Sequence, residues 1–258
     1  MANCWLRARR KQSDPTKRSS PLIWGTIMLL EATELKSGYG KVQILHGVDF
    51  AVPPGRITTV LGPNGAGKST LMKTLSGHLP VMGGTFLYNG KSLAGRHALS
   101  ICLAGIGYVP QEANVFFDLS VRDNLLASAL AFEGAAERVA EVFRRFPILE
   151  ERAEQRASTL SGGERQTLAI ATALVTGPEV MILDEPTSGL APIFVDRILG
   201  WVGELAQDGM GVAWVVEQNP EKILAISETT YVIDAGRNAD TIESGSLLEP
   251  GRLESVLL

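Results

Sequence analysis

Hydrophobic and polar positions along the chain follow two different periods. Short apolar runs rich in branched residues, Arg56–Leu61 and Val180–Leu183, predict strands that are buried inside a parallel sheet. Longer segments with apolar residues three or four positions apart, Asn124–Phe132 and Ala135–Phe146, predict amphipathic helices. Because strand and helix patterns both recur along the chain, the pattern favours an α/β protein.

The order of the predicted elements divides the chain into three parts. Strands dominate the beginning, helices fill the middle after a capping pattern at Ser120–Asp123, and strands alternate with helices toward the end. The other predicted elements are strands at Leu29–Leu35, Gln43–Val52, Gly83–Asn89, Gly211–Val216 and Thr229–Asp234, a buried apolar segment at Ile101–Val109, and helices from Lys68 to about His78, from Gly162 or Gly163 to about Thr176, at Ala191–Gln207 and at Pro220–Ala225. With no internal repeat, this order predicts a single α/β domain that carries a helical insertion.

Composition narrows the class of protein. The chain has 258 residues, of which 45% are hydrophobic and 20% charged, as in globular proteins. Its net charge of −4 provides no general basic field for nucleic acid, so we expect no nucleic-acid partner. Cys4 and Cys102 are far apart and match no disulfide or metal spacing. No apolar run approaches the roughly 20 residues that cross a bilayer, so work at a membrane requires another subunit.

Residues 1–27 differ from the rest of the chain. They contain several arginines and lysines with serines and two prolines, followed by the apolar run Leu22–Leu30. This resembles a signal peptide, but no small-residue cleavage site follows and the run passes directly into the first predicted strand. We therefore expect a disordered basic leader, or an upstream start with Met28 as the functional first residue. Targeting or contact with a membrane surface is the alternative.

A glycine-rich loop between a predicted strand and a predicted helix provides the clearest chemistry. Residues 62–70 read GPNGAGKST and match the phosphate-loop pattern G-x-x-x-x-G-K-[ST]. The glycines allow backbone N–H groups to approach phosphates. Lys68 is expected to reach the β- and γ-phosphates, and Ser69 to bind Mg²⁺. The expected nucleotide-binding residues of this loop are Gly62, Pro63, Asn64, Gly65, Ala66, Gly67, Lys68, Ser69 and Thr70.

Two carboxylates end the buried strand at residues 180–183. Parallel strands end at one edge of their sheet, so Asp184 and Glu185 should lie beside the phosphate loop. Asp184 is expected to hold Mg²⁺, directly or through water, and Glu185 to polarise the water that attacks the γ-phosphate. Whether Glu185 is a full general base or only positions the water is open at this point.

The heptapeptide LSGGERQ, residues 160–166, predicts a second helix start suited to phosphate. Helix N-termini expose unpaired N–H groups at the positive end of the helix dipole. Ser161, Gly162 and Gly163 occupy this position. The chain thus serves either two nucleotides or one nucleotide shared between two chains.

With GPNGAGKST, LSGGERQ and MILDEP in this order, the chain resembles the ABC-type ATPases from about Leu29 to Leu258. The resemblance implies a P-loop NTPase (RecA-like) core with an antiparallel β subdomain and a helical subdomain at about residues 112–160, using ATP and Mg²⁺. It also implies that Tyr39 stacks on adenine and that Gln111 contacts Mg²⁺ or the attacking water. In such ATPases the LSGGQ-like helix completes the site of a second subunit, so Ser161, Gly162 and Gly163 would bind the ATP held by Lys68 of another chain.

One position departs from the family pattern. Gln218 stands where most such ATPases carry a histidine; a glutamine can orient water but does not titrate. The segment VEQN at 216–219, together with SGLAP at 188–192, resembles the second ATPase of branched-chain amino-acid uptake systems and its urea or amide relatives. Pro110 is followed by Gln111 and Glu112 rather than by the glutamate-glycine pair of many such members, and the polar stretch Asn238–Thr241 is also unusual.

The resemblance implies an ATP-hydrolysing transporter subunit at the cytoplasmic face of the cell membrane. Its partners would be a second ATPase subunit, identical or related, the membrane permease subunits and, indirectly, a solute-binding protein. We expect the coupling surface around Gln111–Asn124, where Phe116 and Phe117 are either exposed or packed inside the helical part. An exporter ATPase would share every catalytic residue, and a soluble ABC ATPase is the third alternative.

Overall fold

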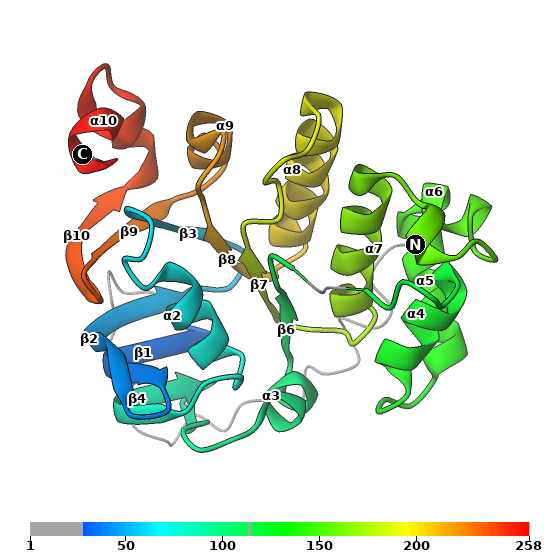
Figure 1. Ribbon diagram of the computed structural model, residues 1–258, viewed down its shortest axis with the longest axis horizontal. Helices are drawn as coiled ribbons and strands as arrows, with labels where there is room; N and C mark the ends of the chain where they lie inside the picture. The colour runs from blue at the N-terminus through cyan, green and yellow to red at the C-terminus, as the bar shows by residue number, and fades with distance from the viewer. Residues whose placement is uncertain (1–27, 113–114, 258) are drawn as a thin grey trace.

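The computed structural model describes residues 28–112 and 115–257. The expectations for the basic leader at residues 1–27 lie outside this part. A parallel sheet forms the centre of the molecule (Figure 1), and its strand order is β10-β9-β3-β8-β7-β6. The parallel strands are β3 (Ile57–Leu61), β6 (Ile106–Val109), β7 (Val180–Asp184), β8 (Gly211–Val215) and β9 (Thr229–Asp234). The edge strand β10 (Arg237–Glu243) runs antiparallel to β9.

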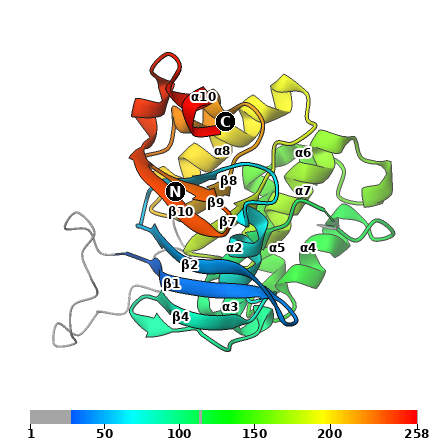
Figure 2. The same cartoon turned by 60° about the vertical axis from the view of Figure 1, so that its left-hand side comes forward.

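A second, antiparallel sheet lies beside the first, and in Figure 2 it faces the viewer at the lower left. Its order is β2-β1-β4-β5. The strands are β1 (Leu30–Tyr39), β2 (Val42–Val52), β4 (Val81–Tyr88) and the short β5 (Lys91–Ser92). The sheet packs on α2 (Lys68–Leu75), because apolar residues of β1, β2, β4 and α2 form one buried cluster with one face of the parallel sheet. This arrangement places the end of β1 close to the start of α2.

The other face of the parallel sheet is covered by helices. Helices α7 (Gly162–Leu174), α8 (Pro192–Gln207) and α9 (Pro220–Leu224) bury their apolar residues against strands β7 and β8 in a second cluster. Trp214 of β8 is fully buried in this cluster. The helices therefore fix one face of the parallel sheet while α2 and the antiparallel sheet fix the other.

A group of helices continues this second cluster away from the sheet (Figure 1). It consists of α4 (Val121–Ala129), α5 (Ala135–Arg145), α6 (Pro147–Glu151) and the 3₁₀ turn η1 (Ala157–Thr159). Ser120 caps α4 by accepting a hydrogen bond from the Asp123 N–H. Phe146 meets Trp201 of α8 edge-on, with ring centroids 4.8 Å apart, and this contact joins the helical group to the core. The chain closes with η2 (Ser244–Leu248) and α10 (Arg252–Leu257).

The structure corrects the prediction for Ile101–Val109. This stretch is not one buried segment, because α3 (Ala98–Ala104) ends there and β6 begins after Gly105. Only Ile101 of α3 is buried, while Leu99 and Leu103 are exposed. Gly105 adopts a left-handed conformation (φ 121°) that ends the helix, and local apolar content did not reveal this break.

The polar stretch at Asn238–Thr241 has a structural explanation at its first residue. The Asn238 side chain accepts a hydrogen bond from the Asp49 N–H (2.7 Å) and donates one to the Asp49 carbonyl (2.9 Å). These bonds join edge strand β10 to β2 of the other sheet. Asn238 thus acts as a side-chain substitute for backbone pairing between the two sheets.

Candidate functional site

The phosphate loop joins β3 to α2 in a conformation that requires glycine. Gly62 has φ 148°, and a Cβ there would lie 2.0 Å from the Ile233 carbonyl oxygen. Gly67 is the N-cap of α2 with φ 108°. At Gly65 (φ 81°) a Cβ would meet no described atom within 4 Å, so the loop is open on that side. The backbone therefore forms a cradle at the N-terminus of α2, where N–H groups attract anions.

Lys68 and Ser69 begin α2, and their side chains have different partners. The Lys68 side chain is only 6% exposed, and its Nζ donates to the carbonyls of Gly62 (2.8 Å) and Pro63 (3.1 Å). The Ser69 hydroxyl donates to Oδ1 of Asp184 at 3.0 Å. The phosphate loop and the acidic strand end, 115 residues apart in the sequence, thus meet at one place.

Asp184 is buried at the end of β7. Its second oxygen, Oδ2, accepts a hydrogen bond from the Tyr108 hydroxyl at 3.3 Å. Burial raises the pKa of Asp184, and the hydroxyls of Ser69 and Tyr108 partly offset this by stabilising the carboxylate. Both oxygens of the carboxylate therefore have donors from the protein.

Glu185 follows in a strained backbone conformation. Its φ of 52° is in the left-handed region, which costs a non-glycine residue on the order of 1–3 kcal/mol. The residue is only 9% exposed, and the Gln111 side-chain amide donates to its Oε2 at 2.9 Å. Burial and the nearby carboxylate of Glu217 raise the pKa of Glu185 to about 7. Glu217 in turn has a lowered pKa, because it is hydrogen-bonded to Glu185 and to the Asn64 side chain.

A hollow of about 260 Å³ lies over the phosphate loop. The described residues that line it are Tyr39, Ile44, Asn64, Gly65, Gly67, Lys68, Ser69, Thr70 and Glu185. Tyr39 ends β1 and is 47% exposed, so one face of its ring is available at the rim. The polar groups gather at the loop and the aromatic ring lies at the edge, as in a site for a phosphate-bearing ligand with a flat base.

The LSGGERQ segment begins α7 and does not line this hollow. Ser161 is its N-cap and forms a capping box with Glu164, so its hydroxyl already accepts from a backbone N–H of its own helix. Glu164 is also paired with Arg152 at 2.6 Å. Gly162 is exposed, whereas a Cβ on Gly163 would overlap the Phe194 ring at 2.2 Å. Ser161 and Gly162 are thus presented on the outside of the chain.

Gln218 lies in the loop after β8. Its Oε1 accepts a hydrogen bond from the Gly189 N–H at 3.1 Å, so it contacts the segment that follows Glu185 rather than the phosphate loop. Neighbouring Asn219 has φ 53°, and this left-handed residue turns the chain into α9. The loop after β8 therefore contacts the segment that follows Glu185 and then leads into α9, on the face of the parallel sheet that the helices cover.

Sequence reasoning missed three residues of this site. Tyr108 lies on β6 in register with Ile182, two positions before Asp184, and the alternation of strand residues could have placed it on the same face. Glu217 follows β8 at the same edge as Asp184, so the edge rule could have found it. Ile44 gave no local signal, because the packing of the antiparallel sheet brings it to the hollow.

The oxygen groups near the loop suit a small hard cation. The Ser69 hydroxyl and the Asp184 carboxylate are 3.0 Å apart, and Gln111 is joined to neighbouring Glu185. Mg²⁺ is usually held by one or two such oxygens together with ligand phosphates and water. Among the described residues, no cluster of three or more His, Cys, Asp or Glu suited to a metal occurs.

Comparisons with known proteins agree with this geometry. A family model described as ABC transporter matches residues 45–188. The branched-chain amino acid transport ATP-binding protein BraG of Pseudomonas aeruginosa is 40% identical over 211 residues, covering 81% of this chain and 90% of BraG. The probable branched-chain amino acid transport protein LivF of Archaeoglobus fulgidus is 38% identical over 232 residues, covering 89% of this chain and 98% of that protein. An ATP-binding cassette of an ABC transporter in its ADP conformation superposes with a TM-score of 0.77 at 25% identity, covering 90% of this chain and 98% of the other.

The chain belongs to the ABC transporter family, as an ATP-binding subunit that hydrolyses ATP in transport. The predicted fold class, a P-loop NTPase core with an antiparallel sheet, is confirmed. In the part of the chain that the structure describes, no helix has both the length and the apolar character of a membrane span.

Proposed function

We propose that this subunit binds ATP in the hollow over the phosphate loop and hydrolyses it with the carboxylates at the end of β7. The observation that carries the proposal is the 3.0 Å contact between Ser69 and Asp184, which joins the phosphate loop to the acidic strand end. Tyr39 stacks on the adenine at the rim. The loop N–H groups and Lys68 hold the phosphates, with Gly62 to Thr70 as the cradle.

Ser69 and Asp184 are the proposed protein ligands of Mg²⁺, with Gln111 as a further oxygen donor that reaches the metal or the attacking water. When bound, Mg²⁺ neutralises charge on the β- and γ-phosphate oxygens. The Ser69 hydroxyl and the Asp184 Oδ1 already face each other, so the protein needs little rearrangement to offer both. Thr70, next along α2, completes the loop and is buried in its first turn.

Glu185 is the proposed catalytic carboxylate. Its raised pKa makes it a proton acceptor matched to neutral pH, which is what a general base for water requires. Gln111 orients it through the 2.9 Å hydrogen bond. Gln218 is the proposed switch residue that orients water or senses the γ-phosphate when the loop after β8 closes. The hydrogen bond from the Gly189 N–H to Gln218 Oε1 joins this loop to the segment that follows Glu185.

We propose that two chains share each ATP. Ser161, Gly162 and Gly163 lie outside the hollow of their own chain, at a helix N-terminus whose first turn carries N–H groups and a positive dipole end. These groups would bind the γ-phosphate of ATP held by a second chain, identical or related, in a two-fold or pseudo-two-fold dimer. Ser161 would then exchange its internal cap for the phosphate.

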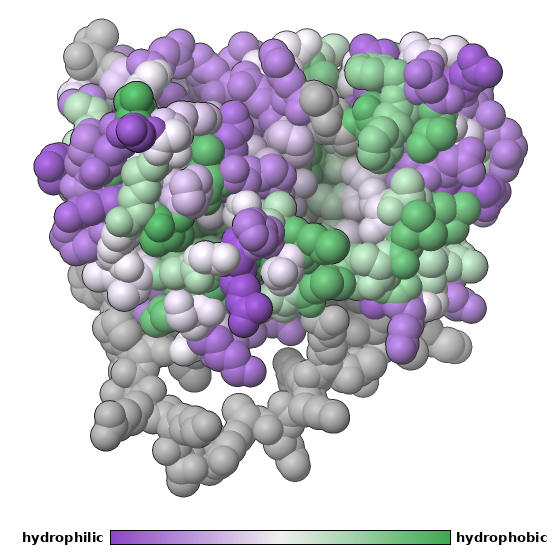
Figure 3. Space-filling view, turned by 60° about the horizontal axis from the view of Figure 1, so that its bottom comes forward, coloured by the Kyte–Doolittle hydropathy of each residue, from purple (hydrophilic) through white to green (hydrophobic). Residues whose placement is uncertain are grey.

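The proposed permease contact is an apolar surface near the helical subdomain, which we place at about residues 112–160. Phe116 and Phe117 are 62% and 52% exposed, and Leu99 and Leu103 of α3 are also exposed. The side of the molecule that carries α3 and α4 has apolar patches on both sides of a hollow (Figure 3). Contiguous exposed apolar patches often mark protein contacts.

The proposed transported solute is a branched-chain amino acid or a similar small solute, taken up with the help of a solute-binding protein. The support is the VEQN and SGLAP segments and the similarity to BraG and LivF, whose names state branched-chain amino acid transport. The subunit would work on the cytoplasmic face of the cell membrane, held there by its permease. An exporter ATPase would use the same catalytic residues, and nucleic acid is not a proposed partner.

The first test replaces the proposed catalytic carboxylate. Glu185→Gln keeps the shape and the Gln111 contact but removes the base, so we expect turnover to fall at least about 100-fold while ATP binding and ATP-dependent dimerisation remain. Phosphate release and size-exclusion chromatography with ATP measure the two properties. Glu179→Gln is the matched control, because Glu179 lies before β7, away from the phosphate loop, and its side chain accepts hydrogen bonds from Tyr88 and Asn89. Normal hydrolysis by Glu185→Gln would overturn the catalytic assignment.

A further inference from the structure

Tyr108 is placed by the sheet beside the proposed magnesium ligand. It is the third residue of β6 and pairs with Ile182 of β7, two residues before Asp184. Because side chains of a strand alternate between faces, Tyr108, Ile182 and Asp184 lie on the face that carries α2. The tyrosine hydroxyl donates to Oδ2 of Asp184 at 3.3 Å, while Oδ1 accepts from Ser69.

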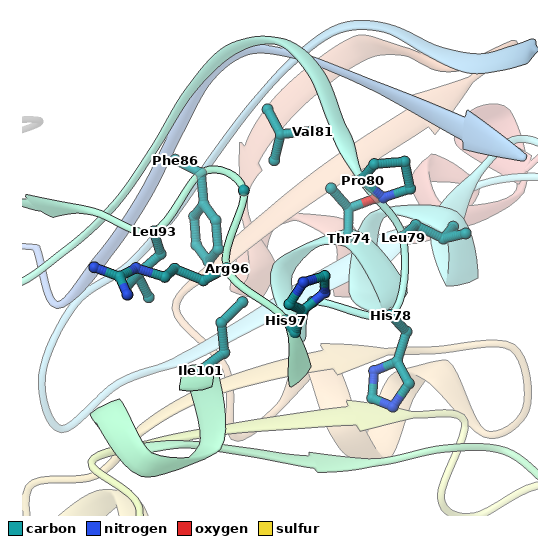
Figure 4. A pocket seen from close by; sticks show the side chains of 12 residues that line it. Thr74, His78, Leu79, Pro80, Val81, Phe86, Leu93, Arg96, His97 and Ile101 are labelled. Carbon is teal, nitrogen blue, oxygen red and sulfur yellow. The ribbon is translucent and has the colours of Figure 1, made fainter. Parts of the chain in front are cut away.

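The environment of Tyr108 fixes its ring and keeps its proton. The His78 ring packs against it, with centroids 5.1 Å apart and the ring planes at 52°. Figure 4 shows that His78, from the turn after α2, lies at the border of a cavity with its ring directed away from Phe86 and Ile101, which also line that cavity. Burial and the Asp184 charge raise the pKa of Tyr108 far above neutral pH, and burial lowers the pKa of His78. Tyr108 therefore donates a hydrogen bond to Asp184 while its ring packs against His78.

A carboxylate that binds a metal through one oxygen can rotate unless its other oxygen is held. Mutation of a residue that hydrogen-bonds to a metal ligand, without itself binding the metal, commonly lowers metal affinity by about 10- to 100-fold. Tyr108 contacts Oδ2 and leaves Oδ1 toward Ser69, which is the orientation that the two proposed ligands need. We propose that Tyr108 is a positioning residue that orients Asp184 for Mg²⁺ and so sets the Mg²⁺ affinity of the nucleotide site. This inference rests on the proposed function.

The alternative is that Tyr108 only packs the core between His78 and the sheet. Removing the hydroxyl while keeping the ring separates the two roles. Tyr108→Phe retains the contact with His78 and loses the hydrogen bond to Asp184. Tyr88→Phe is the matched control, since Tyr88 also donates to a carboxylate, Oε2 of Glu179 at 2.8 Å, at the opposite end of β7 from Asp184.

The experiment titrates Mg²⁺ into the full chain with a fluorescent ATP analogue and measures binding, with a parallel series in EDTA. For Tyr108→Phe we expect the Mg²⁺ midpoint to rise about tenfold, with analogue affinity in EDTA unchanged within about twofold. Tyr88→Phe should match the unsubstituted chain in both series. Asp184→Asn should lose nearly all of the Mg²⁺ dependence.

Two results would overturn the role of Tyr108. One is an unchanged Mg²⁺ midpoint in Tyr108→Phe; the other is an equal loss of binding with and without Mg²⁺, which would mark a packing role. Either result leaves the proposed ATPase site in place, because the unsubstituted chain still responds to Mg²⁺ and Asp184→Asn does not. A chain that binds the analogue with no Mg²⁺ dependence at all would instead overturn the proposed metal site together with this inference.

Discussion

At the scale of single residues, Asp184 and Glu185 at the end of β7 have different surroundings, and we propose different roles for them. Asp184 has hydroxyl donors on both oxygens, which hold the carboxylate in one orientation and partly offset the effect of burial on its pKa. Glu185 lies against the carboxylate of Glu217, with an amide donor on one oxygen, and its pKa is about 7. Like charges at short range favour the protonated form of one partner. The proposed roles of these adjacent residues, metal ligand for Asp184 and proton acceptor for Glu185, follow this difference in surroundings.

The raised pKa of Glu185 predicts that the stabilities of the unsubstituted chain and of Glu185→Gln, both without nucleotide, differ by an amount that depends on pH. Glu185 is protonated up to about pH 7 when folded but only to about 4.5 when unfolded. The folded state therefore loses stability as pH rises through this window, and the loss is complete above it. Glu185→Gln cannot lose this proton, so its melting temperature should exceed that of the unsubstituted chain by a few degrees at pH 8 and much less at pH 5. Thermal unfolding at both pH values measures this, and an equal difference at both would contradict it.

At the scale of elements, the start of α7 combines a structural and a functional demand. Its first turn is stabilised inside the chain by the Ser161–Glu164 capping box and by the Arg152–Glu164 ion pair. Gly163 permits α8 to approach closely, because its Cα faces the Phe194 ring. Gly162 faces outward. Only one of the two glycines is thus required by packing within this chain.

This difference predicts the stabilities of two alanine variants. Gly163→Ala would force Phe194 to move and should lower the free energy of unfolding by about 1–3 kcal/mol, as overpacking usually does. Gly162→Ala is the matched control, because the nearest atom to its Cβ is Leu190 Cδ2 at 4.0 Å, and its stability should be unchanged or slightly higher. Urea unfolding of the isolated chain measures both. Equal losses in the two variants would contradict the packing role of Gly163.

At the scale of the whole molecule, the proposed sharing of ATP between two chains follows from where one chain places its phosphate-binding groups. The phosphate loop, the acidic strand end and Tyr39 gather at one hollow, while the start of α7 is directed elsewhere. In an isologous dimer, the start of α7 of each chain would face the hollow over the phosphate loop of the other chain. Two nucleotide sites would then be completed at once. Binding of ATP would then stabilise the dimer, because the nucleotide belongs to both subunits.

Mixing two inactive variants tests this sharing. Lys68→Ala damages the phosphate loop and Ser161→Arg blocks the start of α7, so each variant alone should lack productive sites. In a mixed dimer both lesions fall in one site and the other site is intact. Random pairing should therefore restore about a quarter of the sites, since half of the dimers are mixed. ATP-dependent turnover of the co-expressed chains measures the recovery. No recovery would contradict a site shared between two copies of this chain.

The order of elements and the chemistry of the loop followed from local sequence. Gly62, Lys68 and Ser69 stand between an apolar strand and a helix, and this context is specific because phosphate binding needs backbone freedom and a helix N-terminus together. Local pattern failed at Ile101–Val109, where a short helix and a strand are both apolar and only Gly105 divides them. Periodicity does not distinguish short apolar runs of the two kinds.

Sequence by itself determined the class of protein, the phosphate loop, the acidic pair and the second helix start, because each depends on residue types at short spacing. Tertiary structure alone decided which residues meet. The pairing of β6 with β7 brings Tyr108 to Asp184, the packing of the antiparallel sheet brings Ile44 to the hollow, and the loop after β8 brings Glu217 to Glu185. These contacts join residues that are far apart in the sequence, and only the strand order and the packing of the layers bring such residues together.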